Sequence, residues 1–381
     1  MFEYIVVGAG FSGAVIAERI SSVLNKKVLV IEKREYVGGN CYDYIDENNI
    51  IVHRHGPHLF HTDCKEVFDY LSKFTDWHIY HHRVLAYVNG KKIPIPFNFN
   101  SIDMLFPAVL SGKLQATLLK KYPAGSRVPI LEMRKTDNRD LQFLSDFIYQ
   151  QIYKNYTVKQ WGKKPEEIGR DVTARVPVVI GRDDRYFTDK YQAVPAEGYS
   201  KIFQTILKHE NIKLLLNADL KDYITLDFES GKIYFRGQEF KGKLIFTGMI
   251  DELCGYKFGL LPYRSLDFRF ETIEKEFYQE TAVINYPNEH DFTRITEFKH
   301  IHPVKNRKTT IVFEYPGEYK RGDIPYYPMF ADETKETHHK YKESTKGFEN
   351  LILAGRLAEY KYYDMDDAVK NALKIFKEKI E

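Results

Sequence analysis

A glycine-rich turn between a strand and a helix, at the start of the chain, constrains the fold more than any other feature. Residues 4–8 (YIVVG) are a β-branched run typical of a buried parallel strand. The turn Gly8–Gly13 (GAGFSG) follows at once, and apolar residues at helical spacing continue over residues 12–24. Residues 27–32 (KVLVIE) then read as a second strand. GxGxxG alone is a weak signal, but in this setting it predicts a β-α-β unit that binds a dinucleotide.

The turn supplies most of the predicted dinucleotide contacts. Gly8 permits the tight turn, Gly10 lets backbone N–H groups approach a pyrophosphate, and Gly13 lets the helix pack closely on the strand. Phe11 and Ser12 open the helix, whose N-terminus brings positive potential to the phosphates. We therefore predict that these residues surround the cofactor.

A second glycine pair favours FAD over NAD. Glu32 ends the second strand, where an acid accepts hydrogen bonds from ribose hydroxyls. Lys33 follows it, and Gly38-Gly39-Asn40 comes a few residues later. A glycine pair soon after the ribose acid resembles the amine-oxidase-like FAD proteins, in which this loop runs close to the cofactor. FAD is therefore the predicted cofactor, with Lys33, Gly39 and Asn40 in its site.

The C-terminal segment supports the same cofactor. A strand over Leu351–Leu353, then Gly355-Arg356, then Asp364 before a helix resembles the last FAD-contacting segment of those proteins. Arg356 is expected near the flavin oxygens, where its charge stabilises a reduced and negatively charged ring.

Length and patterning predict how the rest of the chain is organised. At 381 residues the chain is too long for one small core, so two or three domains are expected. Residues 101–160 look mainly helical, and residues 265–315 alternate as in an antiparallel sheet. Asn89-Gly90, between residues 83–88 and 91–95, predicts a β-hairpin.

Charge and cysteine usage exclude several classes of partner. The formal net charge is +3 and no run of five or six like charges occurs, so nucleic acid is not an expected partner. The sequence has no apolar stretch of about 18 residues, so no transmembrane helix is expected. The opening MFEYIVVGAG does not resemble a signal peptide. Cys41, Cys64 and Cys254 are scattered without metal spacing, which suits a reduced cytoplasm.

Four histidines, His53, His55, His58 and His61, look at first like a metal cluster. No cysteine or acid with zinc spacing follows them. We therefore predict no metal site.

Longer strings make a family resemblance specific. The chain resembles bacterial UDP-galactopyranose mutases along nearly its whole length, through segments such as VVGAGFSGAVIAERI, HGPHLFHT and TRITEFKH. NYTVKQWG and GRLAEYKYYDM are rare strings, and we know of no other family that carries both. The resemblance implies an α/β fold: an FAD-binding Rossmann-like (GxGxxG) sheet domain with an inserted helical domain and an antiparallel β-sheet domain.

The same resemblance implies how these domains divide the chain. A discontinuous FAD-binding domain is expected over residues 1–80, 196–260 and 346–381, and a helical domain over residues 98–160. The antiparallel sheet domain, which binds the substrate, is expected over residues 81–97, 161–195 and 261–345. It includes a mobile loop near residues 170–185 that carries an arginine over the active site.

The activity implied is that of a flavin-dependent isomerase that interconverts UDP-galactopyranose and UDP-galactofuranose. In this family N5 of reduced FAD attacks the anomeric carbon, and no net redox change occurs. A homodimer in the cytoplasm is implied as well. Two other classes stay open: an FAD-dependent oxidoreductase of the amine-oxidase-like class, and a nucleotide-sugar-binding protein without catalysis. The sequence does not decide among galactose, N-acetylgalactosamine and arabinose as the sugar.

The resemblance also implies roles for single side chains, and their chemistry agrees with those roles. The planar guanidinium of arginine suits phosphate oxygens, tyrosine hydroxyls donate without adding charge, and an aromatic face suits a flat base. The predicted catalytic residues are Arg175, Arg294 and His58, the arginines on the diphosphate and His58 near the flavin and sugar. The predicted substrate-binding residues are Tyr156 on the uracil, Trp161, Arg175, Tyr186, Asn285, Arg294, Tyr315 and Tyr362. The predicted flavin contacts of the second half of the site are His58, Arg356, Tyr363, Asp364 and Met365.

Some positions depart from the family pattern. Glu197 stands where relatives have glycine, near the cofactor, and His82 and Arg83 stand where some relatives have small polar residues. Arg182 and Arg185 add charge to the region of the mobile loop. These departures leave the exact sugar open without changing the class of protein.

Overall fold

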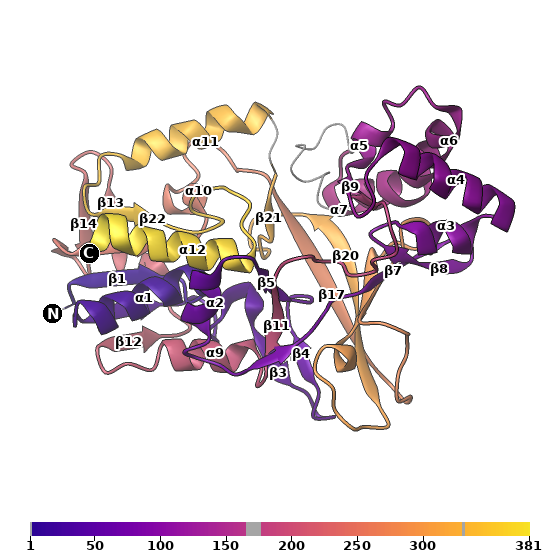
Figure 1. Ribbon diagram of the computed structural model, residues 1–381. Helices are drawn as coiled ribbons and strands as arrows, with labels where there is room; N and C mark the ends of the chain where they lie inside the picture. The colour runs from indigo at the N-terminus through magenta and orange to yellow at the C-terminus, as the bar shows by residue number, and fades with distance from the viewer. Residues whose placement is uncertain (1, 165–176, 330–331) are drawn as a thin grey trace.

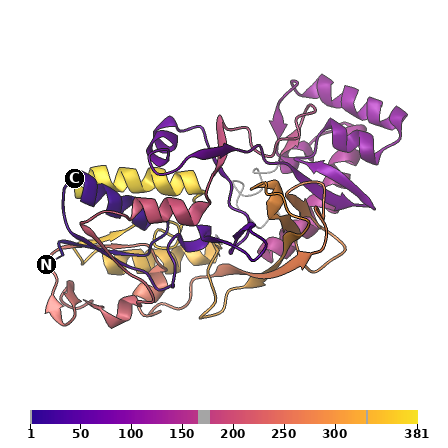
Figure 2. The ribbon, with the colours of Figure 1, turned by 90° about the horizontal axis from the view of Figure 1, so that it is seen from below.

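The computed structural model describes residues 2–164, 177–329 and 332–381. Figure 1 shows a lobe that carries both chain termini and a helical lobe on the opposite side, with long strands running between them. Figure 2, seen from below, shows helices α1, α9 and α12 side by side over one face of the terminal lobe. In the described residues no helix is both long and apolar enough to cross a membrane.

A five-stranded parallel sheet forms the centre of the terminal lobe. Its strands, in spatial order, are β12 (Ile212–Leu215), β2 (Val28–Ile31), β1 (Tyr4–Val7), β16 (Lys243–Phe246) and β22 (Leu351–Leu353). Every neighbouring pair is parallel. The predicted strand–helix–strand unit at the N-terminus is confirmed as β1, α1 (Phe11–Val23) and β2.

Both faces of this sheet are covered, which explains why its strands are continuous apolar runs. Val6 and Val30 point into a core cluster shared with α1, α9 (Tyr199–Ile206) and α12 (Met365–Ile375). Ile5 and Ile31, one residue away along each strand, point into a second cluster on the other face. A small three-stranded sheet covers that face: β13 (Ile224–Asp227), β14 (Lys232–Phe235) and β15 (Gln238–Glu239).

A seven-stranded sheet joins the two lobes. Its strands, in spatial order, are β21 (Tyr327–Pro328), β17 (Tyr263–Ile273), β20 (Thr309–Glu318), β19 (Arg294–Glu297), β18 (Val283–Asn285), β7 (Val84–Val88) and β8 (Lys91–Ile95). The predicted hairpin is confirmed as the antiparallel pair β7–β8. The sheet was expected to be antiparallel throughout, but β18 pairs with β7 in parallel. The two strands come from distant parts of the chain, so no tight turn imposes an antiparallel direction on them.

The helical lobe consists of short helices that pack on β7 and β8. They are α3 (Phe99–Leu105), α4 (Ala108–Lys121), α5 (Ile130–Met133), α6 (Arg139–Ile148) and α7 (Asn155–Trp161). A π-helical segment, Tyr149–Lys154, connects α6 to α7, and the pair β9 (Arg127–Val128) and β10 (Val178–Val179) closes the lobe. Single π-helical turns are frequent at functional sites, and this one lies beside the NYTVKQW segment.

The remaining elements are short. They are β3 (Asp43–Ile45), β4 (Ile51–His53), β5 (Phe60–Thr62), α2 (Lys65–Leu71), β6 (Trp77–Ile79), β11 (Tyr191–Pro195), α10 (Ile250–Leu253), α11 (Asp332–Thr345), the 3-10 turns Gly39–Cys41, Leu220–Asp222 and Phe298–His300, and the π-helical end Phe376–Ile380. Strands β5, β11 and β6 form one small antiparallel sheet. That sheet hydrogen-bonds two segments assigned above to different domains, so the domain boundaries stay a prediction.

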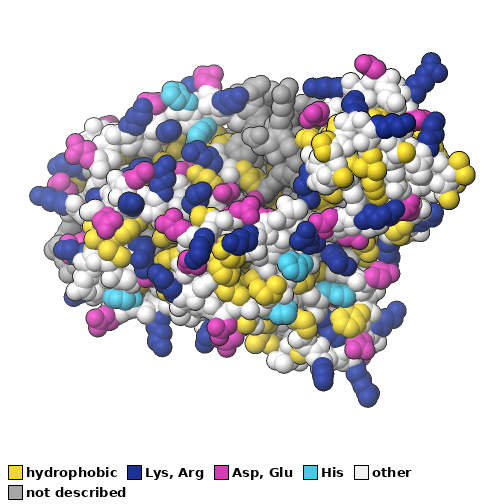
Figure 3. All heavy atoms as spheres, in the orientation of Figure 1, with side chains coloured by type: hydrophobic (Ala, Val, Ile, Leu, Met, Phe, Trp, Pro, Cys, Tyr) yellow, Lys and Arg dark blue, Asp and Glu magenta, His cyan; other side chains and the backbone are white. Residues whose placement is uncertain are grey.

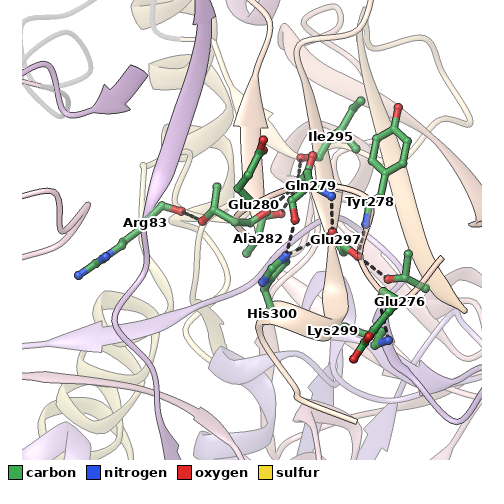
Figure 4. Close-up of polar contacts among 12 residues, drawn as sticks. Arg83, Glu276, Tyr278, Gln279, Glu280, Ala282, Ile295, Glu297, Lys299 and His300 are labelled. Carbon is green, nitrogen blue, oxygen red and sulfur yellow. Dashed lines mark hydrogen bonds and ion pairs between the residues drawn. The ribbon is translucent and has the colours of Figure 1, made fainter. Parts of the chain in front are cut away.

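A buried charge cluster holds the outer loops of the large sheet onto β19 (Figure 4). The Glu297 carboxylate accepts hydrogen bonds from the backbone N–H groups of Tyr278 and Gln279, each at 2.9 Å, and from the Thr309 hydroxyl at 2.7 Å. The Lys299 ammonium donates to three backbone carbonyls, the closest being those of Glu276 and Asn306 at 2.7 Å. Both side chains are at most 1% exposed.

Glu297→Ala is expected to lower the free energy of unfolding by about 3 kcal/mol, because it leaves the donors of Tyr278, Gln279 and Thr309 without the carboxylate that accepts from them. Glu280→Ala is the matched control, since the ion pair of Glu280 with Lys92 is exposed and its loss should change stability by less than about 0.5 kcal/mol. Urea denaturation measures both. Equal effects would show that the cluster of Figure 4 contributes no special stability.

Candidate active site

The glycine turn is shaped for a ligand at one position and for packing at another. A Cβ on Gly13 would lie 2.0 Å from the carbonyl oxygen of Gly8, so this glycine lets α1 pack on the turn. A Cβ on Gly10 would meet nothing closer than the Cα of Gly39, at 3.9 Å. Gly10 and Gly39 therefore lie close together, and both line the cavity at the N-terminus of α1, where a pyrophosphate can approach the backbone.

A cavity of about 810 Å³ opens at this turn. It runs from the carboxyl ends of β1 and β2 to the C-terminal segment before α12. Of the predicted cofactor residues, all but Gly13 line it: Gly8, Gly10, Phe11, Ser12, Glu32, Lys33, Gly39, Asn40, His58, Arg356, Tyr363, Asp364 and Met365. Residues far apart in the sequence thus meet in one space large enough for a dinucleotide.

Glu32 is held for ribose recognition. Its carboxylate is buried and accepts hydrogen bonds from the backbone N–H groups of Ala9 at 2.8 Å and Arg34 at 2.9 Å. These contacts fix both oxygens at the cavity wall, where further lone pairs can accept from ribose hydroxyls.

His58 presents a neutral imidazole to the cavity. Its Nδ1 donates to the carbonyl oxygen of Gly56 at 2.9 Å, and its backbone N–H donates to Nδ1 of His53 at 3.0 Å. Burial lowers the pKa of His58 to about 4, against an opposing effect of the Gly56 hydrogen bond and with a smaller contribution from Arg356. At neutral pH the free Nε2 is therefore a hydrogen-bond acceptor rather than a cation.

Arg356 is fixed by main-chain oxygens. Its Nη1 donates to the carbonyl of Tyr326 at 3.0 Å, and its Nε and Nη2 donate to the carbonyl of Tyr363. The guanidinium carbon also lies 5.5 Å from the ring centre of Tyr327 and 5.3 Å from that of Tyr362. Because these hydrogen-bond partners are carbonyls and not carboxylates, the positive charge remains available to an anionic group in the cavity.

A second cavity of about 100 Å³ lies between the helical lobe and the large sheet. It brings together four predicted substrate residues: Tyr156, Trp161, Tyr186 and Asn285. The aliphatic residues Ala86, Ile95 and Ile152 line it as well, so the cavity combines apolar and aromatic walls with a few polar groups.

Two buried polar atoms in this second cavity have no hydrogen-bond partner among the residues that the structure describes. They are Oδ1 of Asn285 and the hydroxyl of Tyr153. Buried polar atoms in native proteins are nearly always hydrogen-bonded, so this pair indicates a ligand with complementary polar groups. Sequence reasoning missed Tyr153, although it lies three residues before Tyr156 and faces the same way on the helix.

Arg294 links the second cavity to the large sheet. It lies opposite Asn285 across β18–β19 and opposite Glu314 across β19–β20. Its Nε is 3.3 Å from Oε1 of Glu314. Burial acts most strongly and lowers the pKa of Arg294, but the Glu314 carboxylate together with nearby tyrosines outweighs it and raises the pKa, so the guanidinium stays charged. Glu314, also missed from the sequence, is 3% exposed.

Tyr327 connects the two cavities and was not predicted. Its ring lies 5.6 Å from that of Trp161, which lines the second cavity, and 6.0 Å from the parallel ring of Tyr362. Burial raises the pKa of Tyr327, so its hydroxyl remains a proton donor. No local pattern in the sequence marks Tyr327, which begins the short strand β21.

Tyr315 does not join the other predicted substrate residues. It follows Glu314 on β20, so its side chain leaves from the other face of the sheet. There the Arg269 guanidinium lies 4.1 Å from the centre of its ring. The assignment of Tyr315 to the phosphates is therefore corrected, and Tyr327 takes its place as the candidate. Arg175 lies outside the described residues.

Of the departures from the family pattern, His82 lies nearest to these residues. Its ring centre is 5.6 Å from that of Tyr186, and its Nδ1 is 3.2 Å from the Tyr80 hydroxyl. Burial, with a contribution from Arg294, lowers the pKa of His82 to about 3, so it is neutral. Arg182 instead donates to Asp103 at an exposed position.

Substitution of the two glycines separates cofactor binding from folding. Gly10→Val should fold, because φ at Gly10 is −80° and a Cβ there would meet nothing closer than 3.9 Å, yet it should bind FAD about ten- to a hundredfold more weakly. Gly13→Val should fail to fold or unfold at much lower temperature, since the new side chain meets the backbone of Gly8. Flavin absorbance after refolding with FAD, together with thermal unfolding, checks both outcomes. Full flavin loading of Gly10→Val would contradict this placement of the pyrophosphate.

Comparison with known proteins agrees with this geometry. A family model described as UDP-galactopyranose mutase matches residues 151–362, and one described as an NAD(P)-binding Rossmann-like domain matches residues 6–74. A dTDP-fucopyranose mutase from Escherichia coli is 34% identical over 376 residues, which is 98% of this chain and 97% of that protein. A UDP-galactopyranose mutase from Mycoplasma genitalium is 34% identical over 382 residues, or 98% and 93% of the two chains.

Solved structures show the same fold. A reduced UDP-galactopyranose mutase superposes with a TM-score of 0.74 at 16% identity, covering 99% of this chain and 93% of that one. A putrescine oxidase superposes with a TM-score of 0.56 at 13% identity, covering 98% and 97%. The predicted fold class and the predicted cofactor, FAD, are confirmed. With family similarity over nearly its full length, this chain belongs to the UDP-galactopyranose mutase family.

Proposed function

We propose that this chain interconverts UDP-galactopyranose and UDP-galactofuranose without net redox change. The observation that carries the proposal is the link between the two cavities. Tyr327 lies between Trp161 in the smaller cavity and Tyr362 and Arg356 beside the larger one. A nucleotide seated in the smaller cavity therefore directs its diphosphate and sugar toward the flavin site.

The smaller cavity suits a pyrimidine base. Tyr156 offers an aromatic face for stacking, and the unpartnered atoms of Tyr153 and Asn285 offer hydrogen bonds to polar ring atoms or to the ribose. A cavity of about 100 Å³ is small, which favours a single ring over the fused rings of a purine.

Arg294 is suited to hold the diphosphate while the bond to the anomeric carbon breaks. Its side chain is only partly exposed, and a charge-assisted hydrogen bond to phosphate is stronger there than in open water. The neighbouring Glu314 offsets part of this charge, so the departing diphosphate can be held without being trapped. Tyr186, Tyr327 and Tyr362 add hydroxyl donors that carry no charge.

The sugar has to open and close again through a different hydroxyl. When bound and reduced, FAD supplies a nucleophilic nitrogen, N5, for the anomeric carbon. His58, neutral with a free Nε2, accepts a hydrogen bond from a sugar hydroxyl and orients the open chain. The ring then closes through O4 instead of O5, and the diphosphate returns from Arg294 to the anomeric carbon, which would release the flavin in its reduced state.

A second substrate, dTDP-fucopyranose, is favoured by one relative and one feature of the cavity. The E. coli relative named for that sugar nucleotide is 34% identical over 98% of this chain. Ala86, Ile95 and Ile152, which line the smaller cavity and belong to one packed core cluster, provide an apolar wall for the 5-methyl group of thymine.

One assay distinguishes these activities. The FAD-loaded protein, reduced with dithionite, is incubated separately with UDP-galactofuranose, dTDP-fucopyranose and UDP-N-acetylgalactosamine, and the sugar nucleotides are separated by chromatography. We expect UDP-galactopyranose from the first. If dTDP-fucopyranose is turned over and UDP-galactofuranose is not, dTDP-fucopyranose is the substrate. If none of the three sugar nucleotides changes its ring size, the isomerase proposal is refuted.

We also propose that the protein acts as a cytoplasmic homodimer through its helical lobe. Figure 3 shows hydrophobic side chains gathered on that lobe. Helices α3, α4 and α6 expose Met104, Val109, Leu119 and Phe143, and Val109 is 89% exposed. Exposed apolar side chains of this kind mark protein interfaces. Light scattering should give the mass of two chains, and Val109→Asp should shift it toward one; a monomeric wild-type protein would refute the dimer.

A further inference from the structure

A pair of buried histidines lies directly behind His58. His53 ends β4 and is fully buried, and His302 follows the 3-10 turn Phe298–His300 and is 7% exposed. Their Nε2 atoms are 3.4 Å apart, and the rings meet edge to face at 5.5 Å between centres. The two residues are far apart in sequence and meet beneath the loop that carries His58.

The hydrogen bonds determine which nitrogen of each ring carries the proton. The backbone N–H of His58 donates to Nδ1 of His53, so that atom is an acceptor and the proton of neutral His53 is on Nε2. Nε2 of His53 then donates to Nε2 of His302, whose own proton is therefore on Nδ1. Burial lowers the pKa of both rings, to about 4 for His302, so both are neutral.

His302 is the acceptor that makes this arrangement possible. The ring of His53 is otherwise packed against the aromatic rings of Tyr199 and Phe298, at 5.6 Å and 5.5 Å between centres. If His302 offered no acceptor, the Nε2 proton of His53 would be buried without a partner. A shift of that proton to Nδ1 would instead set it against the N–H of His58, so either tautomer leaves a buried donor unsatisfied.

The loop between His53 and His58 has little freedom to absorb such a change. Gly56 has a φ of +82°, and a Cβ there would lie 2.8 Å from the ring of Phe268. The carbonyl of the same residue accepts the hydrogen bond from Nδ1 of His58, which leaves Nε2 of His58 directed to the cavity. The orientation of the His58 ring therefore depends on the loop being held at both ends.

We propose that His302 is a positioning residue for catalysis. By accepting the proton of His53, it keeps His53 in the tautomer that binds the backbone of His58. This holds the free nitrogen of His58 at the point where sugar and flavin meet. The catalytic part of this inference rests on the proposed function, whereas the tautomer of each ring does not.

The test compares His302→Leu, which removes the acceptor, with His302→Gln, whose side-chain oxygen restores one. His339→Leu, an exposed histidine of α11, is the control for substitution as such. On FAD-loaded protein labelled with nitrogen-15 histidine, NMR should show His53 protonated on Nε2 in the wild type and in His302→Gln. In His302→Leu that signal should be lost or shifted.

In steady-state kinetics His302→Leu should lower kcat by about ten- to a hundredfold, because a small misplacement of a group at the reacting centre costs about that much. KM should change little, since the nucleotide contacts are elsewhere. His302→Gln should recover most of kcat, and His339→Leu should match the wild type.

Several results would overturn the proposal. His53 protonated on Nδ1 in the wild-type protein would do so even if no variant folded and no sugar were turned over. Equal losses of kcat in His302→Leu and His302→Gln, or normal kcat in His302→Leu, would also refute it. Failure of the wild-type protein to isomerise any sugar nucleotide would refute the proposed function, while the tautomers would still decide whether His302 positions the loop.

Discussion

Replacing Arg294 with alanine should lower turnover about a hundredfold or more while the flavin stays bound. A hydrogen bond from a charged donor to phosphate contributes about 1.5–3 kcal/mol, which is about ten- to a hundredfold in rate. The substitution also leaves the Glu314 carboxylate buried beside the diphosphate without its partner, which adds repulsion. Steady-state kinetics with the substrate identified above measures the loss, and flavin absorbance reports cofactor retention.

Two further variants make this result specific. Arg269→Ala removes an arginine from the opposite face of the same sheet, next to Tyr315, and should keep normal turnover. Adding Glu314→Gln to Arg294→Ala should recover part of the lost activity, because it removes the unpaired charge. If Arg269→Ala were as damaging as Arg294→Ala, the substrate would bind on the other face of the sheet.

Much of the fold could be predicted because local patterns carry it. The strand–turn–helix–strand unit at the N-terminus and the Asn89-Gly90 hairpin each depend on residues close together in sequence, and both are confirmed. The parallel pairing of β18 with β7 could not be predicted. It depends on how two distant segments meet after the chain has folded, and neither strand alone encodes its direction relative to the other.

The same distinction between local patterns and long-range contacts applies to the residues of the candidate site. The cofactor residues follow glycine and helix-start signals that have a local physical meaning, and the structure places nearly all of them around one cavity. The tyrosines lack such a signal. Tyr315 and Tyr327 each lie on a strand of the large sheet, and which face each side chain takes depends on the register of that strand.

Residues that act through a neighbour are still harder to find from sequence. Glu314 can be assigned a role only because it pairs with Arg294 on the adjacent strand. His302 can be assigned one only because it contacts His53, which is far away in the sequence. As isolated letters, an acid in a strand and a histidine after a turn are ordinary. Burial and pairing make them part of the site, and both are properties of the folded molecule.

The protein with oxidised flavin should be inactive, and one reduction should support many turnovers. Substrate and product are isomers, so the reaction consumes no electrons, yet a nucleophilic N5 requires the reduced ring. Arg356, held by carbonyl oxygens and not by a carboxylate, leaves its positive charge to stabilise that reduced, anionic state.

The experiment that tests this starts from protein reduced without air by one equivalent of dithionite. The reduced protein is then given excess UDP-galactofuranose, or dTDP-fucopyranose if the assay above selects it. Many equivalents of the isomer should form while the flavin absorbance stays bleached. In an amine-oxidase-like oxidoreductase, by contrast, the flavin would be reduced and reoxidised in every catalytic cycle. Electron consumption in step with product would therefore establish the oxidoreductase alternative, and full activity of the oxidised protein would refute the requirement for a reduced, nucleophilic N5.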